Sequence, residues 1–567
     1  MPEQVADQLK IDINNEPPVP SIAAAFLVNF DHRKGYTLGW HKSIADVELR
    51  GVVEFKSLPS GLHNVEEDLV YFIHEEYAGL SAFINKPDQQ SDRAARMLAV
   101  GILVPLEHGR IGRSWRHAEN LKELARTQID EPTNTTALEE YWDKYRLKPE
   151  DHPPQTPHDS AGDESLQGPN GYTKSRSMST TTTFVSSHHS LTPHHPALTL
   201  MDSLKLFGPL IFPLYRAALL RKRILIVTDT PVEFACNLVY NLSILASIPR
   251  TVLAVLPVAD DPIIRLRPLF TVGVWDITQL EQENAARPGQ GFIACTTDDV
   301  LASKPDLYDV LVLMPKSEAQ QAAIKVFPRI VLSSPELTKA FPKVGIRATQ
   351  RDAHRFSHLL RNIHCYEPSE AAATDNDVSS VLSDSSSYSV NKEVIEPSSW
   401  SQVAYTSLVW WASAGDRRTG FAEGEENESE RDLALLRGAE EEDQTQEVAV
   451  VGYFRRMTAA IFTTLASAIA RADGGEQSSE QYRDEEEEEE GSTSSVVGST
   501  QEENQALLAD EGEKAEVDIN HEDMIEMCLD SWSVSDKKFV EELVQLWWKR
   551  KAVVRPASIE CCGLRIL

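Results

Sequence analysis

Short apolar runs separated by turn formers fill the first part of the chain. AAAFLVNF (23–30) has the length of a buried strand, and DHRKG (31–35) follows it with turn character. VVEFKSL (52–58), LVYFIHEEY (69–77) and GLSAFIN (79–85) are each compatible with a strand. These runs predict an antiparallel sheet.

Helical spacing follows the predicted strands. DRAARMLAVGILV (92–104) places its apolar residues at near-helical spacing, and HAENLKELARTQI (117–129) is amphipathic. The residues at near-helical spacing in the first segment are Ala94, Ala95, Leu98 and Ala99. We expect two helices that cover the sheet.

The stretch LPSGLHN (58–64) interrupts this pattern. Pro59 fixes one backbone torsion and Gly61 permits a positive one, so the stretch predicts a connection between two strands. His63 has the chemistry of a catalytic base, but the sequence identifies no partner for it. We interpret His63 as a hydrogen-bonded structural residue.

From residue 198 to 348 the pattern alternates between strand and helix. The segment 202–222 predicts a helix broken by Pro209 and Pro213, RILIVTDT (223–230) a strand, and EFACNLVYNLSILA (233–246) a helix that Thr230 and Pro231 start. TVLAVLPV (251–258) predicts a strand, and 291–315 predicts strand, short helix, strand. This alternation is typical of a parallel sheet flanked by helices.

Enzyme motifs do not accompany this predicted parallel sheet. The turn after RILIVTDT lacks GxGxxG, and GxxxxGK[ST], GxSxG and HExxH are absent from the sequence. Cys295 lies in an apolar strand, where a buried inert thiol is far commoner than a nucleophile. The sequence therefore offers no catalytic, cofactor-binding or metal-binding residues.

Helical pieces recur downstream at 400–413, 447–472 and 536–554. Phe539, Leu543 and Leu546 form an apolar stripe beside Trp547 and Trp548, which we interpret as core packing.

The segment Val448–Ala470 has two interpretations. Its apolar stretch of about fourteen residues is shorter than the roughly twenty that span a bilayer. One alternative is packing on the rest of the protein, and the other is a helix on a membrane surface. In the second alternative Tyr453, Phe454, Ile461 and Phe462 enter the interface beside Arg455 and Arg456.

Polar tracts separate the folded blocks. Residues 148–197 are rich in Ser, Thr, Pro and His, a composition typical of a disordered linker. Four of its histidines could hold a metal in principle, but with no carboxylate or Cys at fixed spacing we interpret them as solvated: His188, His189, His194 and His195. We expect further disordered tracts at 369–389, 415–447 and 473–513, and an extended conformation for DEEEEEEG.

Composition narrows the function classes. At 567 residues with a net charge of -32, the chain predicts two or three folded blocks and argues against nucleic acid as a partner. Six cysteines without zinc or disulfide spacing favour a reducing compartment, and the N-terminus shows no secretion signal, so we expect a cytosolic protein. The cysteines are Cys236, Cys295, Cys365, Cys528, Cys561 and Cys562.

Several segments together resemble the DENN-domain proteins, in the fungal-type branch related to LCHN. FLVNFDHRKGYTLGW, GVVEFKSLPSGLHNVEEDLVYF, YAGLSAFIN and RAARMLAVGILV are similar to the upstream module, in the same order. LFGPLIFPLYRAALLRKRILIVTDTPVEFACNLVYNLSILA resembles the central module. The downstream part departs from the family pattern through its long acidic and Ser-rich insertions.

The resemblance implies an α/β protein with a longin-like upstream module, a parallel-sheet central module and a helical downstream part. On this basis we expect a flexible N-terminus (1–20), an upstream module (21–147), a linker (148–197), a central module (198–348) and a downstream part (349–567). DENN proteins act on Rab-type small GTPases as guanine nucleotide exchange factors in vesicle traffic. Such catalysis needs a shaped surface and implies no cofactor.

Three classes of function stay open at this point. The first is a Rab exchange factor or regulator of vesicle traffic, which is cytoplasmic and peripheral on vesicles or lipid droplets. The second is a non-catalytic adaptor that binds a GTPase or an organelle such as a lipid droplet. The third is a metabolic enzyme built on the parallel sheet.

Overall fold

The computed structural model describes most of the region from Val19 to Arg565, with gaps. The described residues are 19–31, 33–44, 47–87, 95–106, 111–148, 191–257, 264–316, 325–333, 345–363, 394–397, 403, 430–436, 445–489, 516–555, 560–561 and 564–565. The tract 369–389 and most of 400–413 and 415–447 lie outside them.

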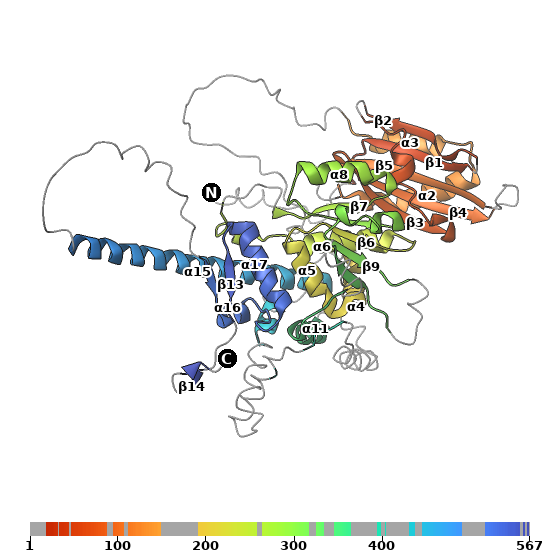
Figure 1. Cartoon of the computed structure of the whole chain (residues 1–567). Coiled ribbons are helices and arrows are strands. Elements are labelled where there is room, and N and C mark those ends of the chain that lie inside the picture. Colours follow the sequence, from red (N-terminus) through yellow and green to blue (C-terminus); the bar gives the residue numbers. More distant parts are fainter. Residues whose placement is uncertain are drawn as a thin grey trace, which may run out of the picture.

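One large sheet organises the molecule (Figure 1). Its strand order is β11-β10-β9-β6-β8-β7-β3-β4-β5-β1-β2, and the sheet is mostly antiparallel. The two sheets expected from the sequence are therefore halves of one sheet, which we call the upstream half (β1–β5) and the central half (β6–β11).

The upstream half is the antiparallel sheet that the sequence predicts. Its strands are β1 (Ala24–Asp31), β2 (Gly35–Ser43), β3 (Glu67–His74), β4 (Tyr77–Pro87) and β5 (Ala95–Pro105). The helices α2 (Ala118–Asp130) and α3 (Thr136–Tyr145) belong to the same half, and α2 packs on β4 and β5. The amphipathic helix expected at 117–129 is confirmed.

Two predictions in this half are wrong. The segment 52–58 contains the short helix α1 (Val53–Lys56), and LPSGLHN then ends in a one-turn 3-10 helix, Leu62–Asn64. The segment 92–104 is strand β5, because its residues pair with β4 on one side and β1 on the other. Long-range pairing on both edges overrides a weak local helical preference.

In the central half, β6 (Ile224–Val227), β7 (Arg267–Thr271), β8 (Phe292–Thr296) and β9 (Val310–Leu313) pair in parallel. Two further strands, β10 (Arg329–Leu332) and β11 (Gly345–Ile346), continue the sheet in antiparallel pairing. Helices α8 (Ile277–Ala286) and α9 (Asp299–Ala302) connect the parallel strands. The strand, short helix, strand order expected at 291–315 is confirmed.

Prolines shape the connections of the central half differently from the prediction. The helix expected at 202–222 is interrupted at Gly208–Leu210 between α4 (Leu200–Phe207) and α5 (Ile211–Leu219), but Pro213 lies inside α5. Pro213 is near the N-terminus of α5, where its missing N–H removes no helical hydrogen bond. TVLAVLPV is a 3-10 turn (Arg250–Val252) and a loop instead of a strand.

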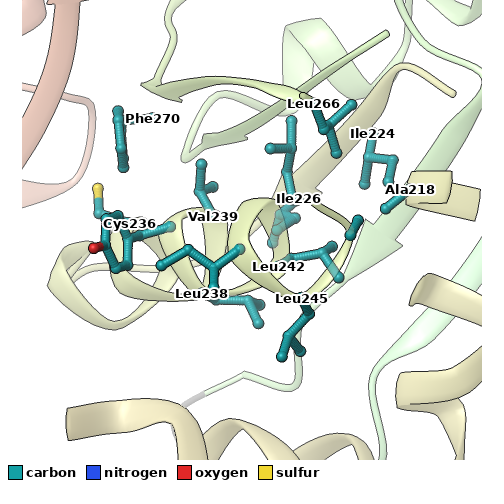
Figure 2. Close-up of a cluster of buried hydrophobic side chains, with 14 of the residues drawn as sticks. Ala218, Ile224, Ile226, Cys236, Leu238, Val239, Leu242, Leu245, Leu266 and Phe270 are labelled. Atoms are coloured by element: carbon teal, nitrogen blue, oxygen red, sulfur yellow. The ribbon is translucent and has the colours of Figure 1, made fainter. Parts of the chain in front are cut away.

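Helix α6 (Glu233–Leu245) packs across the point where the two halves meet. It contacts β7 and β8 of the central half and β3 of the upstream half. Figure 2 shows its buried face, where Val239 and Leu242 lie between the helix and the side chains of Ile226 and Leu266. This helix therefore belongs to the cores of both halves.

The end of the expected linker is ordered around two histidines. His195 is buried, and its Nδ1 accepts a hydrogen bond from the Ala197 backbone N–H. His194 Nε2 lies 2.9 Å from the Glu119 carboxylate. These two histidines are not the solvated residues that the sequence predicted, whereas His188 and His189 lie outside the described residues.

The downstream part is mainly helical, as expected. It contains α11 (Gln350–Ile363), α15 (Gln446–Glu489), α16 (His521–Glu526), α17 (Val534–Trp548) and the parallel strand pair β12 (Val517–Ile519) and β13 (Ala552–Val554). Phe539 and Leu543 of α17 are buried, which confirms core packing. Helix α15 continues to Glu489, so the extended conformation expected for the acidic run is wrong up to that residue.

The first half of α15 is a core helix. Tyr453, Phe454, Ile461 and Phe462 are all buried, and Phe454 stacks on Phe212 of α5 with 5.7 Å between ring centroids. The membrane-surface alternative is therefore wrong for these side chains. Among the described residues, Pro196–Leu219 is the one helical stretch long and apolar enough to span a membrane, but 72% of its apolar 18-residue segment is buried inside the protein.

Buried charges attach the downstream part to the central half. Arg216 of α5 donates two hydrogen bonds to the Asp352 carboxylate of α11, at 2.9 and 2.6 Å. Arg216 also lies 3.3 Å from Asp536 of α17. Because these groups are almost fully buried, separating the two parts would leave unpaired charges in the core.

Candidate functional surface at the junction of the two halves

The two halves of the sheet meet through a single residue pair, Phe72 on β3 with Phe270 on β7. The pairing of β7 with β8 shifts register between Pro268 and Phe270, and the backbone of Phe270 has a positive φ of 59°. A bulge of this kind kinks a strand and ends its regular pairing. The junction is therefore the narrowest connection in the sheet.

A cleft of about 1030 Å³ opens beside this junction. Lys56, Ile73 and Glu75 form its wall on the upstream half, while β7 and α8 supply the other wall. Its volume is at the upper limit for a small-molecule pocket, and its lining mixes both signs of charge. The shape suits a protruding segment of another protein.

An ion pair spans the cleft. Lys56 Nζ lies 2.9 Å from Asp276 Oδ1 and also donates a 2.8 Å hydrogen bond to the Ile73 carbonyl. Asp276 Oδ2 in turn accepts from the Gly273 backbone N–H at 2.9 Å. These bonds fix the short 3-10 helix Val274–Asp276 of the central half against α1 of the upstream half.

Four aromatic rings form a continuous row across the same boundary, which we call the aromatic row. Phe55 stacks on Trp275 with 4.1 Å between centroids, and the row continues through Tyr36 at 6.5 Å from Phe55 and Phe30 at 5.5 Å from Tyr36. Burial, and then the charge of Asp298, raise the pKa of Tyr36. The row therefore consists of neutral rings over the working pH range.

Trp275 is the most exposed large aromatic side chain among the described residues, at 65%. Val274 beside it is 40% exposed, and Val300 of α9 is 51% exposed. Trp is among the side chains most enriched at the energetic centres of protein–protein interfaces. The row thus presents a rigid apolar surface at the boundary of the two halves.

The LPSGLHN stretch helps to fix the two halves together. Gly61 has a φ of 88°, as predicted, and its carbonyl accepts a 3.1 Å hydrogen bond from Thr230 Oγ1. His63 is exposed, and it bonds through its backbone carbonyl, which accepts from Asn85. The ring of His63 is therefore not the hydrogen-bonded structural group that we expected.

Asp68 of β3 also joins the upstream half to the central half. Its carboxylate accepts from the backbone N–H groups of Val232 at 2.7 Å and Glu233 at 3.2 Å, at the start of α6. Burial raises the pKa of Asp68 to about 7. This carboxylate from the upstream half therefore caps a helix of the central half, at the carboxyl end of β6 where open α/β sheets usually bind ligands.

Groups suited to chemistry are not assembled here. Among the described residues no group of three or more His, Cys, Asp or Glu side chains is placed to hold a metal ion. Cys295 is fully buried, as predicted. The arrangement supports recognition by a surface.

Sequence reasoning missed the residues that form this surface. Phe55 was assigned to a strand, and neither Trp275 nor Asp68 was singled out. Trp275 in the stretch GVWD was the available signal, because Trp is enriched at the energetic centres of protein interfaces.

Comparisons with known proteins agree with the resemblance seen in the sequence. The family model for DENN domain-containing protein 11 matches residues 25–324, and a domain of unknown function, DUF4484, matches residues 395–567.

Animal relatives of the same name match about half of the chain. DENN domain-containing protein 11 of Xenopus laevis is 34% identical over 297 residues, which cover 51% of this chain and 59% of the relative. The Mus musculus protein of the same name is 33% identical over 296 residues, 51% of this chain and 57% of the relative. The chain therefore spans less than three fifths of these animal relatives.

A match over most of the chain comes from yeast. Uncharacterized protein ANR2 of Saccharomyces cerevisiae is 26% identical over 487 residues, 81% of this chain and 85% of that protein. With its family model matched over more than half of its length, the chain belongs to the DENN domain-containing protein 11 family.

Proposed function

We propose that this protein binds a Rab-type small GTPase at the junction of its two halves and accelerates release of GDP. DENN-domain proteins in general act as exchange factors for Rab GTPases, and the family is established for this chain. We also assign the upstream half to a longin-like module and the central half to the parallel-sheet DENN module.

The observation that carries the proposal is the exposed Phe55–Trp275 stack, built from both halves and next to a cleft. Exchange requires a surface that favours the open, nucleotide-free conformation of the GTPase through differential contacts. A rigid row of rings beside a cleft can receive an apolar switch segment without any proton transfer. Cytoplasmic location with peripheral attachment to vesicles fits this activity.

The second candidate is an adaptor that binds a GTPase, or an organelle such as a lipid droplet, without changing nucleotide release. The same exposed Trp275 favours it, because a binding surface by itself does not specify exchange.

One experiment separates the two candidates. Release of a fluorescent GDP is measured from a panel of purified Rab GTPases with the full chain, and binding is measured in parallel. Acceleration for one Rab supports the exchange factor, whereas saturable binding with an unchanged GDP off-rate supports the adaptor. No binding to any Rab in the panel would contradict both GTPase proposals.

A further inference from the structure

Two thiols face each other in the core beside the junction. Cys236 lies in the first turn of α6 and Cys295 lies in β8, with 3.7 Å between their sulfur atoms. Their exposed fractions are 1% and 0%. Figure 2 shows Cys236 at one end of the buried cluster, next to Phe270.

The surroundings keep both sulfur atoms in place. Thr271 Oγ1 lies 3.2 Å from Cys236 Sγ and 3.8 Å from Cys295 Sγ, and Cys236 Sγ donates to the Tyr71 carbonyl at 3.8 Å. The hydrogen bond with Cys236, and then burial, raise the pKa of Cys295 well above its ordinary value. The Cys295 thiol is therefore held in its neutral form, and because both sulfur atoms are buried only a small, uncharged oxidant reaches them readily.

We propose that Cys236 and Cys295 are a modification site that hydrogen peroxide converts into a disulfide in the folded protein. The sulfur of one thiol attacks one oxygen of the peroxide, the O–O bond breaks, and the thiol proton goes to the departing hydroxide, which gives a sulfenic acid and one water. The second sulfur then attacks the sulfenic sulfur, the S–S bond forms and a second water leaves. Two hydrogen atoms leave the protein, and one peroxide is reduced to two waters.

The geometry favours this pairing. A disulfide needs its sulfur atoms at about 2 Å, and the two sulfur atoms already face each other at 3.7 Å. Cys528 has a different environment, because its Sγ donates to the Glu526 carbonyl at 3.8 Å and no thiol is described beside it.

The bond would fasten the first turn of α6 to β8. That turn is the one capped by Asp68 of the upstream half, so the disulfide would stiffen the region where the halves meet. It would also close a loop between residues 59 positions apart. Such a cross-link restricts the unfolded chain, so the oxidised protein should unfold at a higher temperature.

The test uses the full chain, treated with hydrogen peroxide under native conditions. Remaining thiols are alkylated, the protein is digested, and peptides are identified by mass spectrometry. We expect a linked peptide pair that contains Cys236 and Cys295, two hydrogen atoms lighter than the reduced pair and separated by dithiothreitol. The unfolding midpoint should rise with the yield of this product.

Two variants are controls. Cys295→Ser should abolish both the linked pair and the rise in midpoint, whereas Cys528→Ser should leave both unchanged. The wild-type peptide map decides the question even where Cys295→Ser folds poorly. A disulfide that forms only in denaturant, or oxidation confined to other cysteines, would overturn the proposal.

Discussion

Phe55 stacks on Trp275 with 4.1 Å between their ring centroids and 27° between their planes. Phe55 belongs to α1 of the upstream half, and Trp275 belongs to a 3-10 helix of the central half. The stack therefore forms only when both halves are folded and joined. Binding of a partner to both rings therefore depends on the relative position of the two halves.

The ion pair between Lys56 and Asp276, which are the residues next to Phe55 and Trp275 in the sequence, should contribute to stability. Lys56→Met keeps the apolar stem but leaves the Asp276 carboxylate without its cation in a site where the two side chains are 13% and 9% exposed. Removing one partner of a largely buried pair is expected to lower the free energy of unfolding by about 3 kcal/mol. Denaturant unfolding measures this loss.

The matched control is Lys86→Met. Lys86 pairs with Asp130 at 2.7 Å, but their side chains are 44% and 64% exposed. Exposed pairs contribute at most about 1 kcal/mol, so this variant should unfold almost like the wild type. Equal losses for the two variants would contradict the assigned role of Lys56.

Gly79 supports the strand that forms the junction. It is the cross-strand partner of Phe72, whose ring lies directly over it, and a Cβ at this position would overlap the ring. Gly79→Ala should therefore displace Phe72 and cost about 1–3 kcal/mol of unfolding free energy. Gly474→Ala, inside helix α15 with open space around the added methyl group, serves as the comparison and should cost nothing, because Ala fits a helical backbone.

Asp536 should make stability depend on pH. Burial, with added repulsion from Asp352, raises its pKa from 3.8 to about 7, against the attraction of Arg216. Because the folded pKa is the higher one, the contribution is complete below pH 3.8 and is lost as the pH rises through about 7.

Asp536→Asn removes this titration. Relative to the variant, the wild type should therefore lose unfolding free energy as the pH rises from 3.8 towards 7. Unfolding midpoints over this range measure the difference. Asp518→Asn, at an exposed pair with Arg555, is the control, and a parallel pH profile for wild type and Asp536→Asn would refute the assignment.

The acidic run 484–490 serves as a spacer in the simplest account, and the alternative is that it inhibits the folded part. Replacing these acidic residues with Gln leaves the buried first half of α15 intact. A deletion from 369 to 520 would instead remove the core residues Tyr453 and Phe454. The spacer account predicts unchanged GDP release for the Gln variant, and faster release would identify inhibition.

Much of the fold could be predicted from the sequence, because the hydrophobic pattern of a long amphipathic or apolar segment indicates both its secondary structure and which of its faces is buried. The helices at 117–129 and 233–246 and the strands at 69–77 and 291–295 carry such patterns. β5 was mistaken for a helix because it is buried on both sides and shows no strand alternation. TVLAVLPV is apolar, but Pro249 precedes it and Pro257 lies within it, and both prolines favour a turn.

The candidate surface could not be predicted because its residues come from distant segments. The contact of β3 with β7 rests on one residue pair, and no local pattern encodes it. Trp275 acquires its role only when α1 supplies Phe55 beneath it. The charge cluster around Arg216 is equally non-local, since Asp352 and Asp536 lie far along the chain.

The most direct test of the central claim is GDP release from the responsive Rab GTPase with Trp275→Ala. A centrally placed Trp typically contributes 2 kcal/mol or more to an interface, so the catalysed rate should fall roughly 30-fold. The thermal midpoint should change little, because Trp275 is 65% exposed. Val534→Ala, at a 78% exposed position of α17, should keep the full rate. Wild-type exchange activity in Trp275→Ala would contradict the assignment of the aromatic row as the recognition surface.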